Sequence, residues 1–504
     1  MILYREVFWY TIGRHTGKVY AVLHCIRRRS MDFKKLYIDG RWVEGVSGKF
    51  IGVENPATET VFAEVPAGTA MDVDRAAKAA KAAFTAWAHT PLSERIEKMR
   101  TMATIFKTME TALTTAIVQE LGAPVGFSRT AQVQYQFERI QSYIELASTV
   151  RWVEKLPHAT VYREPVGVVG CITPWNYPLG QIVQKVIPAI LAGNTVVLKP
   201  SQHTPLTAFY LAEAFHRAQF PKGVFNLVTG RGGDIGDVMA EHEDLQMISF
   251  TGSTPAGVSV ARLALQSMKR ISMELGGKSP CILLPGCDYE KAIAMCFNSI
   301  FLNSGQTCTA LSRLLIPVQD KEKIEALLKK TVSLYTVGDP TREDVQLGTV
   351  SSARHFKTIR AYIEKGLRGG ADLLAGEIPQ KTSVGYYVQP TIFTNVTNDM
   401  TIAQEEIFGP VLCVITYRTE AEAVRIANDT RFGLSGAVWG ATKEEAVRIA
   451  RQIRTGNVYI NDGPRDVTAP FGGFKESGLG REGGVDGILE FTEPQALFDD
   501  GTIG

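Results

Sequence analysis

The stretch Val166-Gly167-Val168-Val169-Gly170-Cys171-Ile172, followed by Leu179 to Leu191 and Thr195-Val196-Val197-Leu198, decides the fold class of this chain. The first and last runs are short and rich in β-branched residues, which is typical of strands. The run between them has the length and apolar character of a helix. A strand, a helix and a second strand at this spacing predict a parallel pair in an α/β sheet whose two faces are both covered.

The same alternation continues towards the carboxyl end. Ligands of such sheets bind beyond the carboxyl ends of the strands. Asn176, Lys199, Ser253 and Glu274 all follow the ends of predicted strands, so we expect a binding site at that edge. The further predicted strands are 224–228, 247–250 and 270–273, and the further predicted helices are 206–218, 233–241 and 254–267.

A second strand–helix series runs from Pro280 to about Asn461 and contains one conspicuous turn, Asn303-Ser304-Gly305-Gln306-Thr307-Cys308-Thr309-Ala310. A predicted helix, 289–302, leads into this turn and a predicted strand, 314–318, leaves it. Glycine lets the backbone turn tightly just before the thiol and leaves the sulfur accessible. A lone cysteine near a helix end is more often a core residue than a nucleophile, so other motifs must decide its role.

The first part of the chain predicts a hairpin and three helices. Asp39-Gly40 is the expected turn of a hairpin over 36–42. Helices are expected over 71–90, from Pro91 onward and near Ala131. From Ser142 to Tyr162 polar and apolar residues alternate, which indicates an exposed β-hairpin.

Length and composition set the broad class. A chain of 504 residues exceeds a single hydrophobic core, so two or three domains are expected. A formal net charge of +2 gives no reason to expect nucleic acid or an anionic membrane as partner, and no apolar run approaches the roughly 20 residues of a membrane span. The seven cysteines are scattered without metal-ligand spacing, which predicts free thiols in the cytoplasm and no metal site.

Residues 1–30 differ from the rest of the chain, because basic residues are interleaved with aromatic ones. In a secretory signal, basic residues come first and an unbroken apolar stretch follows them. Residues 1–30 do not show this arrangement, so they do not resemble a secretory signal. We interpret it as an extension that the domain beginning at Met31-Asp32-Phe33 does not need, with an organelle transit peptide as the alternative.

Five motifs, in the order expected, resemble those of the aldehyde dehydrogenase superfamily, and the similarity runs from about Leu36 to Thr492. Asn55-Pro56-Ala57-Thr58 is similar to a further, early motif of the same family. The five are Pro174-Trp175-Asn176-Tyr177-Pro178, Leu198-Lys199-Pro200-Ser201, Met273-Glu274-Leu275-Gly276-Gly277-Lys278, Glu406-Ile407-Phe408-Gly409-Pro410 and Pro470-Phe471-Gly472-Gly473.

The resemblance implies a three-part α/β architecture. It implies a Rossmann-type cofactor domain (31–141 and 163–275) and an α/β catalytic domain (276–472). It also implies a small β-arm (142–162 and 484–498, with a strand at 488–492) that pairs with another subunit, and hence a homodimer or homotetramer. An ordinary surface hairpin is the alternative for the first arm segment.

The resemblance also implies a catalytic set. Cys308 corresponds to the nucleophile, and the side-chain amide of Asn176 with the backbone N–H of Cys308 to the oxyanion donors. Glu274 corresponds to the general base that activates water. Taken alone, Asn176 would be a turn residue between two prolines and Glu274 a solvent-facing residue after a strand. None of the eight histidines falls within a family motif, so a glutamate base fits better than a Cys–His pair.

The implied cofactor is NAD or NADP. A helix that opens after Phe250-Thr251-Gly252-Ser253 would offer free N–H groups to a pyrophosphate. Lys199 resembles the residue that contacts the adenosine ribose, and Glu406 the one that binds the nicotinamide ribose. The glycines after 228 are spaced G-x-G-x-x-x-G, which is not the dinucleotide fingerprint, so we interpret them as a turn near the adenine. The predicted cofactor residues are Ile172, Pro174, Trp175, Lys199, Ser201, Gln202, Gly232, Gly236, Phe250, Thr251, Gly252, Ser253, Leu275, Gly276, Glu406 and Phe408.

Two positions, Gln202 and Leu302, depart from patterns within the family, and the role of a third residue, Arg465, is open. Gln202 stands where many NAD-preferring relatives have a glutamate that repels a 2′-phosphate, so NADP should be tolerated. Leu302 stands where enzymes for succinic semialdehyde have arginine, which disfavours a short aldehyde acid. Arg465 is either a contact for a substrate carboxylate or a loop cation.

The function we predict is oxidation of an aldehyde to a carboxylic acid with NAD or NADP, with water as the second substrate. A CoA-acylating semialdehyde dehydrogenase is one alternative, and Glu274 argues against it because such enzymes lack the base. A cofactor-independent thiol esterase and a non-catalytic relative are the others, and the combination of Cys308, Asn176 and Glu274 argues against the latter.

Overall fold

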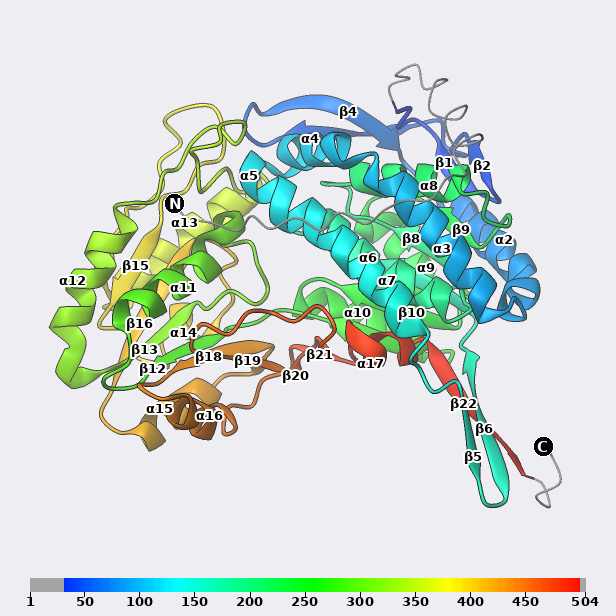
Figure 1. Cartoon of the computed structure of the whole chain (residues 1–504). Helices are drawn as coiled ribbons and strands as arrows, with labels where there is room; N and C mark the ends of the chain where they lie inside the picture. Colours follow the sequence, from blue (N-terminus) through cyan, green and yellow to red (C-terminus); the bar gives the residue numbers. More distant parts are fainter. Residues whose placement is uncertain (1–30, 499–504) are drawn as a thin grey trace, which may run out of the picture. The chain divides into compact units, whose positions relative to one another are not determined.

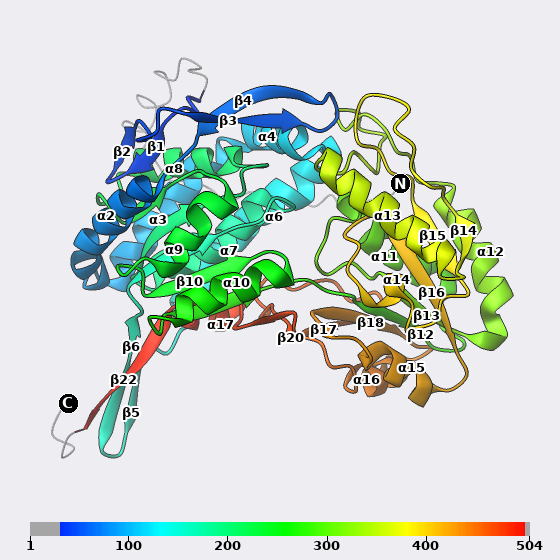
Figure 2. The same ribbon diagram turned by 180° about the vertical axis from the view of Figure 1, so that it is seen from behind.

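Two open β-sheets organise residues 31–498, the part of the chain that this computed structural model describes (Figures 1 and 2). The first sheet has the strand order β2-β1-β9-β8-β7-β10-β11-β21, and its five strands β7 to β11 run parallel. Its strands are β1 Leu36–Ile38, β2 Arg41–Val43, β7 Val168–Ile172, β8 Thr195–Lys199, β9 Phe225–Leu227, β10 Met247–Thr251, β11 Arg270–Glu274 and β21 Gly478–Leu479.

Helices cover both faces of the first sheet, as the sequence predicts. Figures 1 and 2 show α7 on one face and α9 and α10 on the other. Every residue of α7 is buried, so its apolar residues lie on all sides of the helix and three polar ones, Gln181, Gln184 and Lys185, are buried with them. The helices of this half are α2 Ala70–Ala88, α3 Leu92–Lys107, α4 Glu110–Leu121, α5 Val125–Phe127, α6 Tyr135–Ala147, α7 Pro178–Leu191, α8 Leu206–Arg217, α9 Asp237–Glu241 and α10 Thr254–Leu265, with π-helical turns η1 Ser128–Gln134 and η2 Gly232–Gly236.

The second sheet has the order β14-β15-β16-β13-β12-β18-β19 and is parallel except for β14. Its strands are β12 Pro280–Leu283, β13 Arg313–Pro317, β14 Asp372–Ala375, β15 Thr391–Thr394, β16 Val411–Tyr417, β18 Ser435–Trp439 and β19 Asn457–Ile460. Its helices are α11 Tyr289–Phe301, α12 Lys321–Val332, α13 Ala353–Arg368, α14 Thr401–Gln404, α15 Glu420–Asn428 and α16 Lys443–Ala450, with short 3₁₀ turns η3 Leu302–Gly305 and η4 Val318–Asp320. The predicted second series, and the helix and strand that flank Cys308, are therefore confirmed.

Three smaller pieces complete the chain. The hairpin β3 Phe50–Asn55 and β4 Thr60–Pro66 forms a sheet of its own, and β17 Phe432–Gly433 pairs with β20 Phe474–Lys475. A projecting arm consists of β5 Val153–Leu156, β6 Ala159–Pro165 and β22 Thr492–Phe498, preceded by α17 Gly484–Leu489. None of the helices within residues 31–498 is long and apolar enough to cross a membrane.

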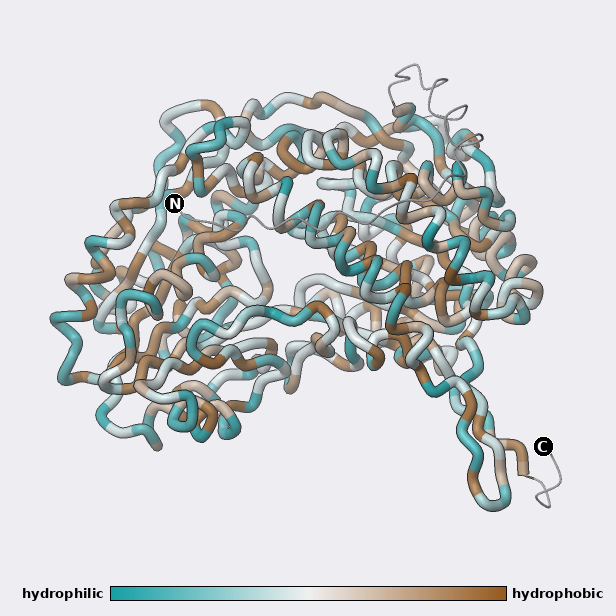
Figure 3. Tube along the Cα trace, viewed as in Figure 1, coloured by the Kyte–Doolittle hydropathy of each residue, from teal (hydrophilic) through white to brown (hydrophobic). Residues whose placement is uncertain are grey.

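In both segments of the arm, the strand starts later in the chain than the sequence predicts. The alternation that starts at Ser142 is first the end of α6, whose apolar side is buried, and the strand starts only at Val153. The strand predicted over 488–492 is also wrong, because Ile488 is buried within α17 and β22 starts at Thr492. Four apolar side chains are exposed along the described part of the arm: Val153, Leu156, Leu497 and Phe498. In Figure 3 the tube of the arm changes repeatedly between hydrophobic and hydrophilic colours.

A buried ion pair ties the C-terminal segment to the first sheet. The Lys185 amine of α7 lies 2.6 Å from Glu482 Oε1 and donates to Ser249 Oγ at 3.3 Å. The side chains of Lys185 and Glu482 are 1% and 2% exposed. Next to them the backbone N–H of Gly483 donates to the Tyr143 hydroxyl at 2.9 Å. Removing one partner would therefore leave an uncompensated charge in the core.

Lys185→Met should lower the free energy of unfolding by about 3–5 kcal/mol, because Glu482 would lose its buried counter-charge. The double variant Lys185→Met/Glu482→Gln should recover most of that loss. Urea denaturation followed by circular dichroism measures both. The matched control is Lys78→Met, which breaks an exposed pair with Asp74 and should cost less than about 1 kcal/mol. An equal cost for Lys78→Met and Lys185→Met would contradict the expectation.

Candidate active site

Two adjacent glycines, Gly276 and Gly277, bring three distant segments together just after β11. A Cβ built on Gly276 would lie 2.8 Å from Glu406 Cδ, and one on Gly277 would lie 2.5 Å from the carbonyl oxygen of Cys308. The backbone N–H of Gly277 donates to Glu406 Oε1 at 2.9 Å. Because no side chain fits at either position, the strand that ends in Glu274, the Cys308 turn and the Glu406 loop can approach at backbone distance.

The turn before Cys308 is held in a left-handed conformation. Asn303, Ser304 and Gly305 have φ values of 52°, 55° and 77°. A Cβ on Gly305 would overlap the Gly409–Pro410 peptide, so glycine is required there for space as well as for φ. Of the six cysteines among residues 31–498, Cys308 alone is not buried. The turn thus leaves Cys308 half-buried and outside the hydrophobic core.

Side chains on both sides hold this turn in place. Ser304 Oγ donates to the carbonyl of Gly348 at 3.1 Å, and the backbone N–H of Ser351 donates to Gln306 Oε1 at 2.8 Å. The Asn176 side-chain amide donates to the carbonyl of Gln306 at 3.0 Å. The carbonyl of Asn176 in turn accepts from Asn303 Nδ2 at 2.8 Å. Asn176 is therefore locked against the Cys308 turn, and one of its two amide hydrogens is used by Gln306.

Glu274 lies at the end of β11 and is 2% exposed. Neither carboxyl oxygen has a hydrogen-bond partner among the described residues. Burial raises the pKa of Glu274 well above its usual range and the charge of Glu482 raises it further, while Lys185 and Arg481 act in the opposite direction. A buried, unpartnered carboxyl group next to a nucleophile is available to exchange a proton.

The thiol of Cys308 is held in its protonated form. Desolvation raises the pKa of Cys308 to about 12, and the carboxyl groups of Glu274 and Glu406 contribute in the same direction. Arg465 lowers the pKa of Cys308. The electrostatics thus place carboxyl groups and a guanidinium within reach of the same sulfur.

Cys308 lines a cavity of about 240 Å³. Its walls come from α6, α7, the end of α11 and the loop after β19. The Tyr177 hydroxyl is 2.9 Å from Thr307 Oγ1, beside the nucleophile. Other lining side chains include Tyr135, Arg139, Gln181, Leu302, Tyr459, Arg465 and Phe471. This cavity is large enough only for a small molecule.

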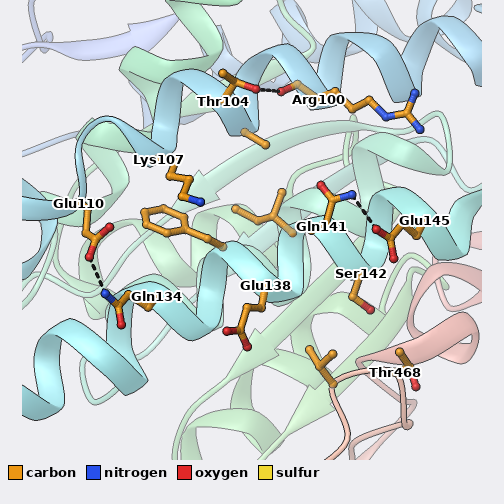
Figure 4. A pocket seen from close by; sticks show the side chains of 14 residues that line it. Arg100, Thr104, Lys107, Glu110, Gln134, Glu138, Gln141, Ser142, Glu145 and Thr468 are labelled. Atoms are coloured by element: carbon orange, nitrogen blue, oxygen red, sulfur yellow. Dashed lines mark hydrogen bonds between the residues drawn. The ribbon is translucent and has the colours of Figure 1, made fainter. Parts of the chain in front are cut away.

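A larger cavity, of about 860 Å³, lies between α3 and α6 and does not contain Cys308 (Figure 4). Its rim carries both signs of charge, with Arg100 and Lys107 facing a space that Glu138 and Glu145 also line. Gln134 and Gln141 are already engaged by Glu110 and Glu145 at 2.7 and 2.8 Å. Because this cavity contains neither the Cys308 turn nor Glu274, it is not the candidate site.

The predicted cofactor residues gather at the carboxyl edge of the first sheet. Ile172 pairs with Lys199 across β7 and β8, and Thr251 pairs with Glu274 across β10 and β11. Ser253 has extended backbone angles, begins α10 and makes no side-chain cap, and the Thr251 hydroxyl is buried without a partner. An uncapped helix start beside an unpartnered hydroxyl fits the phosphate group of a dinucleotide.

The other predicted cofactor residues lie around this edge. Lys199 donates to the carbonyls of Pro200 at 3.1 Å and Gly230 at 3.5 Å, and burial lowers the pKa of its amine to about 8. Gly232 and Gly236 bound the π-helical turn η2, where the sequence predicts the start of a regular helix. Along the edge, Pro174, Ser201 and Gln202 are half-buried, whereas Phe250, Gly252 and Leu275 belong to or adjoin β10 and β11.

An aromatic cluster beside the Glu406 loop contains His355, a residue outside the motifs of the sequence analysis. Trp175 packs edge-on to Phe408 and to His355, with ring centroids 5.4 and 5.3 Å apart. His355 Nε2 is 2.8 Å from the carbonyl oxygen of Phe408, whose φ is 59°. Since a carbonyl only accepts, Nε2 carries the hydrogen, and burial lowers the pKa of His355 to about 4. His355 therefore steadies the strained Phe408 as a neutral donor.

Three lining residues of the Cys308 cavity, Arg139, Gln181 and Tyr459, were also missed by sequence reasoning. Arg139 and Gln181 lie on helices α6 and α7, outside the motif segments, and Tyr459 lies on β19. Only the packing of these elements around the turn at 303–308 brings them together. The periodicity of α6 and α7 identifies buried faces and gives no sign of which buried polar residues face a cavity.

The chain matches the sequence profile of the aldehyde dehydrogenase family over residues 42–497. It is 43% identical to aldehyde dehydrogenase C of Pseudomonas syringae, solved as a cysteine-to-alanine mutant with NAD+ and octanal; the match covers 92% of this chain and 96% of that one, with a TM-score of 0.91. An aldehyde dehydrogenase of Mycobacterium tuberculosis complexed with NAD+ is 38% identical (94% and 100% covered, TM-score 0.92). Betaine aldehyde dehydrogenase of Staphylococcus aureus with NAD+ is 34% identical (94% and 96%, TM-score 0.90).

Glu406→Gln should make the cofactor-free protein less sensitive to pH. Burial raises the pKa of Glu406 from 4.5 to about 7, so the folded state binds the proton more tightly than the unfolded state. The contribution of this proton to the free energy of unfolding is fully present below pH 4.5 and is lost as the pH rises through about 7. For this partly buried group the loss should be about 1–3 kcal/mol. Urea titrations at pH 5 and 8 should show a smaller decrease for Glu406→Gln than for wild type.

Glu405→Gln is the control, because it removes a neighbouring carboxylate from the same loop. Its decrease in stability between pH 5 and pH 8 should equal that of the wild type. Equal decreases between pH 5 and pH 8 in wild type and Glu406→Gln would mean that Glu406 is not a proton-binding site of the folded state.

Proposed function

The chain belongs to the aldehyde dehydrogenase family and is an NAD(P)-dependent aldehyde dehydrogenase, and we propose that it works through a covalent intermediate on Cys308 that water hydrolyses to the carboxylic acid. The observation that carries this proposal is the contact of the Cys308 backbone with Gly277, three residues after the buried and unpartnered carboxyl group of Glu274. A nucleophile and a free base on adjoining segments are what acyl transfer to water requires.

In the first step the Cys308 thiol gives its proton to solvent water, the sulfur adds to the aldehyde carbon, and the carbonyl oxygen becomes an oxyanion. The Asn176 amide has a second N–H available, and among the described residues no hydrogen bond uses the backbone N–H of Cys308. These two donors would stabilise the oxyanion, and losing one such donor typically costs about 100- to 1000-fold in rate. Asn176 is held rigidly by Gln132 and Asn303, which favours this pre-organised role.

The cofactor supplies the hydride acceptor that converts this adduct into a thioester. Lys199, Ser253 and Glu406 would hold it at the edge of the first sheet, with Trp175 and Phe408 packed beside it. Glu274 would then take a proton from water, whose oxygen attacks the thioester carbon; the C–S bond breaks and Cys308 is released. The raised pKa of Glu274 matches a base that must accept a proton near neutral pH.

We further propose that the arm joins subunits into a homodimer or homotetramer. Its exposed apolar side chains, Val153, Leu156 and Leu497 among them, support a partner surface. The division into a cofactor domain (31–141 and 163–275) and a catalytic domain (276–472) is supported by the separation of the two sheets. The free thiols of the six described cysteines support a reducing, cytoplasmic location.

Glu274→Gln should stop turnover after the thioester forms, because the amide cannot accept a proton from water. Given aldehyde and cofactor, this variant should accumulate an acyl adduct on Cys308 that intact-mass spectrometry detects. Cys308→Ala should give neither adduct nor product while still binding cofactor. Cys287→Ala, at a buried thiol away from the cavity, is the matched control and should remain active. Unchanged steady-state turnover in Glu274→Gln would assign the base to another residue.

Gln202→Glu should shift the preference between cofactors. Lys199 retains most of its charge at pH 7 and can bind a hydroxyl or a phosphate, so rejection of NADP needs a nearby negative charge. Gln202 supplies no such charge. We therefore expect the rate of the wild-type enzyme with NADP to be within about tenfold to a hundredfold of its rate with NAD. Gln202→Glu should move the ratio of kcat/KM values towards NAD by a similar factor. Gln266→Glu, an exposed position at the end of α10, is the control; an unmoved ratio in Gln202→Glu would refute the role of position 202.

A further inference from the structure

We propose that the substrate of this enzyme is an aldehyde that carries a carboxylate at its far end, held by Arg139 and Arg465 in the Cys308 cavity. This inference rests on the proposed function, because it places the aldehyde carbon at Cys308. It adds the charge of the rest of the substrate, which the motifs leave open and on which the named relatives differ, since octanal is neutral and betaine aldehyde is cationic.

The two arginines are the only charged residues among those that line the Cys308 cavity within the described chain. Arg139 comes from α6 and is 6% exposed, and its guanidinium lies 4.9 Å from the centre of the Tyr135 ring. Arg465 comes from the loop after β19 and lies 4.8 Å from the centre of the Phe471 ring. No aspartate or glutamate lines this cavity in the part of the chain that the structure describes.

Neither guanidinium forms an ion pair with any described residue. Arg139 makes one hydrogen bond, from Nη1 to Gln136 Oε1 at 2.7 Å, which leaves four of its five N–H groups for other acceptors. Asp466 follows Arg465 directly, but its carboxylate accepts from the backbone and side chain of Thr468, at 2.8 and 2.7 Å. The buried Arg139 and the exposed Arg465 thus give this cavity a positive charge that no carboxylate lining it offsets, which favours an anionic ligand.

Arg139 is buried, whereas Arg465 is exposed. Burial lowers the pKa of Arg139 and the charge of Arg465 lowers it further, while the charge of Glu482 acts in the opposite direction. A buried guanidinium is unfavourable unless a counter-charge joins it. A carboxylate can accept two parallel N–H groups from a guanidinium, which satisfies both its charge and its geometry.

Two polar groups without partners belong to residues that line the same cavity. The Tyr135 hydroxyl and Gln181 Oε1 are both buried and have no hydrogen-bond partner among the described residues. Both line the cavity with Arg139. The hydroxyl can donate to a carboxylate, and an unpaired buried polar group costs free energy until it is satisfied.

Apolar and aromatic walls lie in the same cavity. Tyr177, Leu302 and Phe471 line it, with Cys308 beside Tyr177 and its partner Thr307. A spacer that is aliphatic or aromatic fits such walls. Leu302 replaces the arginine of enzymes for succinic semialdehyde, so the anion would be bound from α6 and the loop after β19 instead. Cationic aldehydes should be the poorest substrates, because the cavity offers them two like charges and no carboxylate.

Matched substrates test the proposal: 4-formylbenzoate against its methyl ester, and 6-oxohexanoate against its methyl ester, with betaine aldehyde as the cationic probe. The full-length enzyme is assayed for kcat/KM with each. We expect each anion to exceed its neutral ester by at least about tenfold, and betaine aldehyde to be the weakest. Arg465→Gln and Arg139→Gln should each lower the ratio of anion to ester by about tenfold to a hundredfold. The ratio cancels any effect of Arg465 on the Cys308 thiol that is common to both substrates.

Arg139 is buried, so Arg139→Lys, which keeps the charge, accompanies Arg139→Gln and should retain part of the preference. Arg425→Gln, at an exposed position of α15, is the matched control and should leave the ratio unchanged. Equal kcat/KM for anion and ester in wild type, or an unmoved ratio in Arg465→Gln, would overturn the carboxylate assignment while leaving aldehyde oxidation intact. Failure to oxidise any of these aldehydes would instead count against the proposed function.

Discussion

The absence of side chains at Gly276 and Gly277 is the constraint on which the rest of the site depends. A β-carbon at the first would overlap the Glu406 carboxyl group, and one at the second would crowd the Cys308 carbonyl oxygen. Because the backbone at Gly276 and Gly277 carries no side chains, the segment after β11 contacts both the Cys308 turn and the Glu406 loop. This contact places segments of the second sheet's half against the carboxyl edge of the first sheet. Ligands of parallel sheets bind at that edge.

A second close contact fixes the direction of the thiol. Gly305 lies against the Gly409–Pro410 peptide, and the left-handed run from Asn303 to Gly305 reverses the chain after α11. Such backbone is costly in isolation, so the surroundings must determine it. They do so through hydrogen bonds from both halves, because Asn176 belongs to the first half and the segment 348–351 to the second. The same segment begins α13, whose His355 donates to Phe408.

The charges around Cys308 are arranged with opposite signs on its two sides. Glu274, Glu406 and Glu482 raise the pKa of the thiol, and Arg465 lowers it. The carboxyl groups sit towards the first sheet and the Glu406 loop, where proton transfer and cofactor binding are proposed. The arginines line the cavity where the aldehyde is proposed to bind. Burial strengthens the interactions of Glu274 and Arg139, whereas Arg465 is exposed; the proposed base and the proposed anion site both influence the Cys308 thiol.

The sequence by itself determined the α/β class, the strands and helices around the parallel sheet, and the motif segments that carry Cys308, Glu274 and Asn176. The strands, helices and turns are local signals, because β-branched runs, helix-length apolar runs and glycine-rich turns follow from neighbouring residues. The segments that carry Cys308, Glu274 and Asn176 were identified by their resemblance to family motifs. Element ends were less certain, as Ser142 and Ile488 show, since a buried helix end and an arm strand share the same alternation. Tertiary structure alone decided that Arg139, Gln181 and Arg465 share a cavity with Cys308, and that His355 contacts Phe408. Those residues lie on elements far apart in the chain, and only the packing of the elements determines which polar side chains face one another.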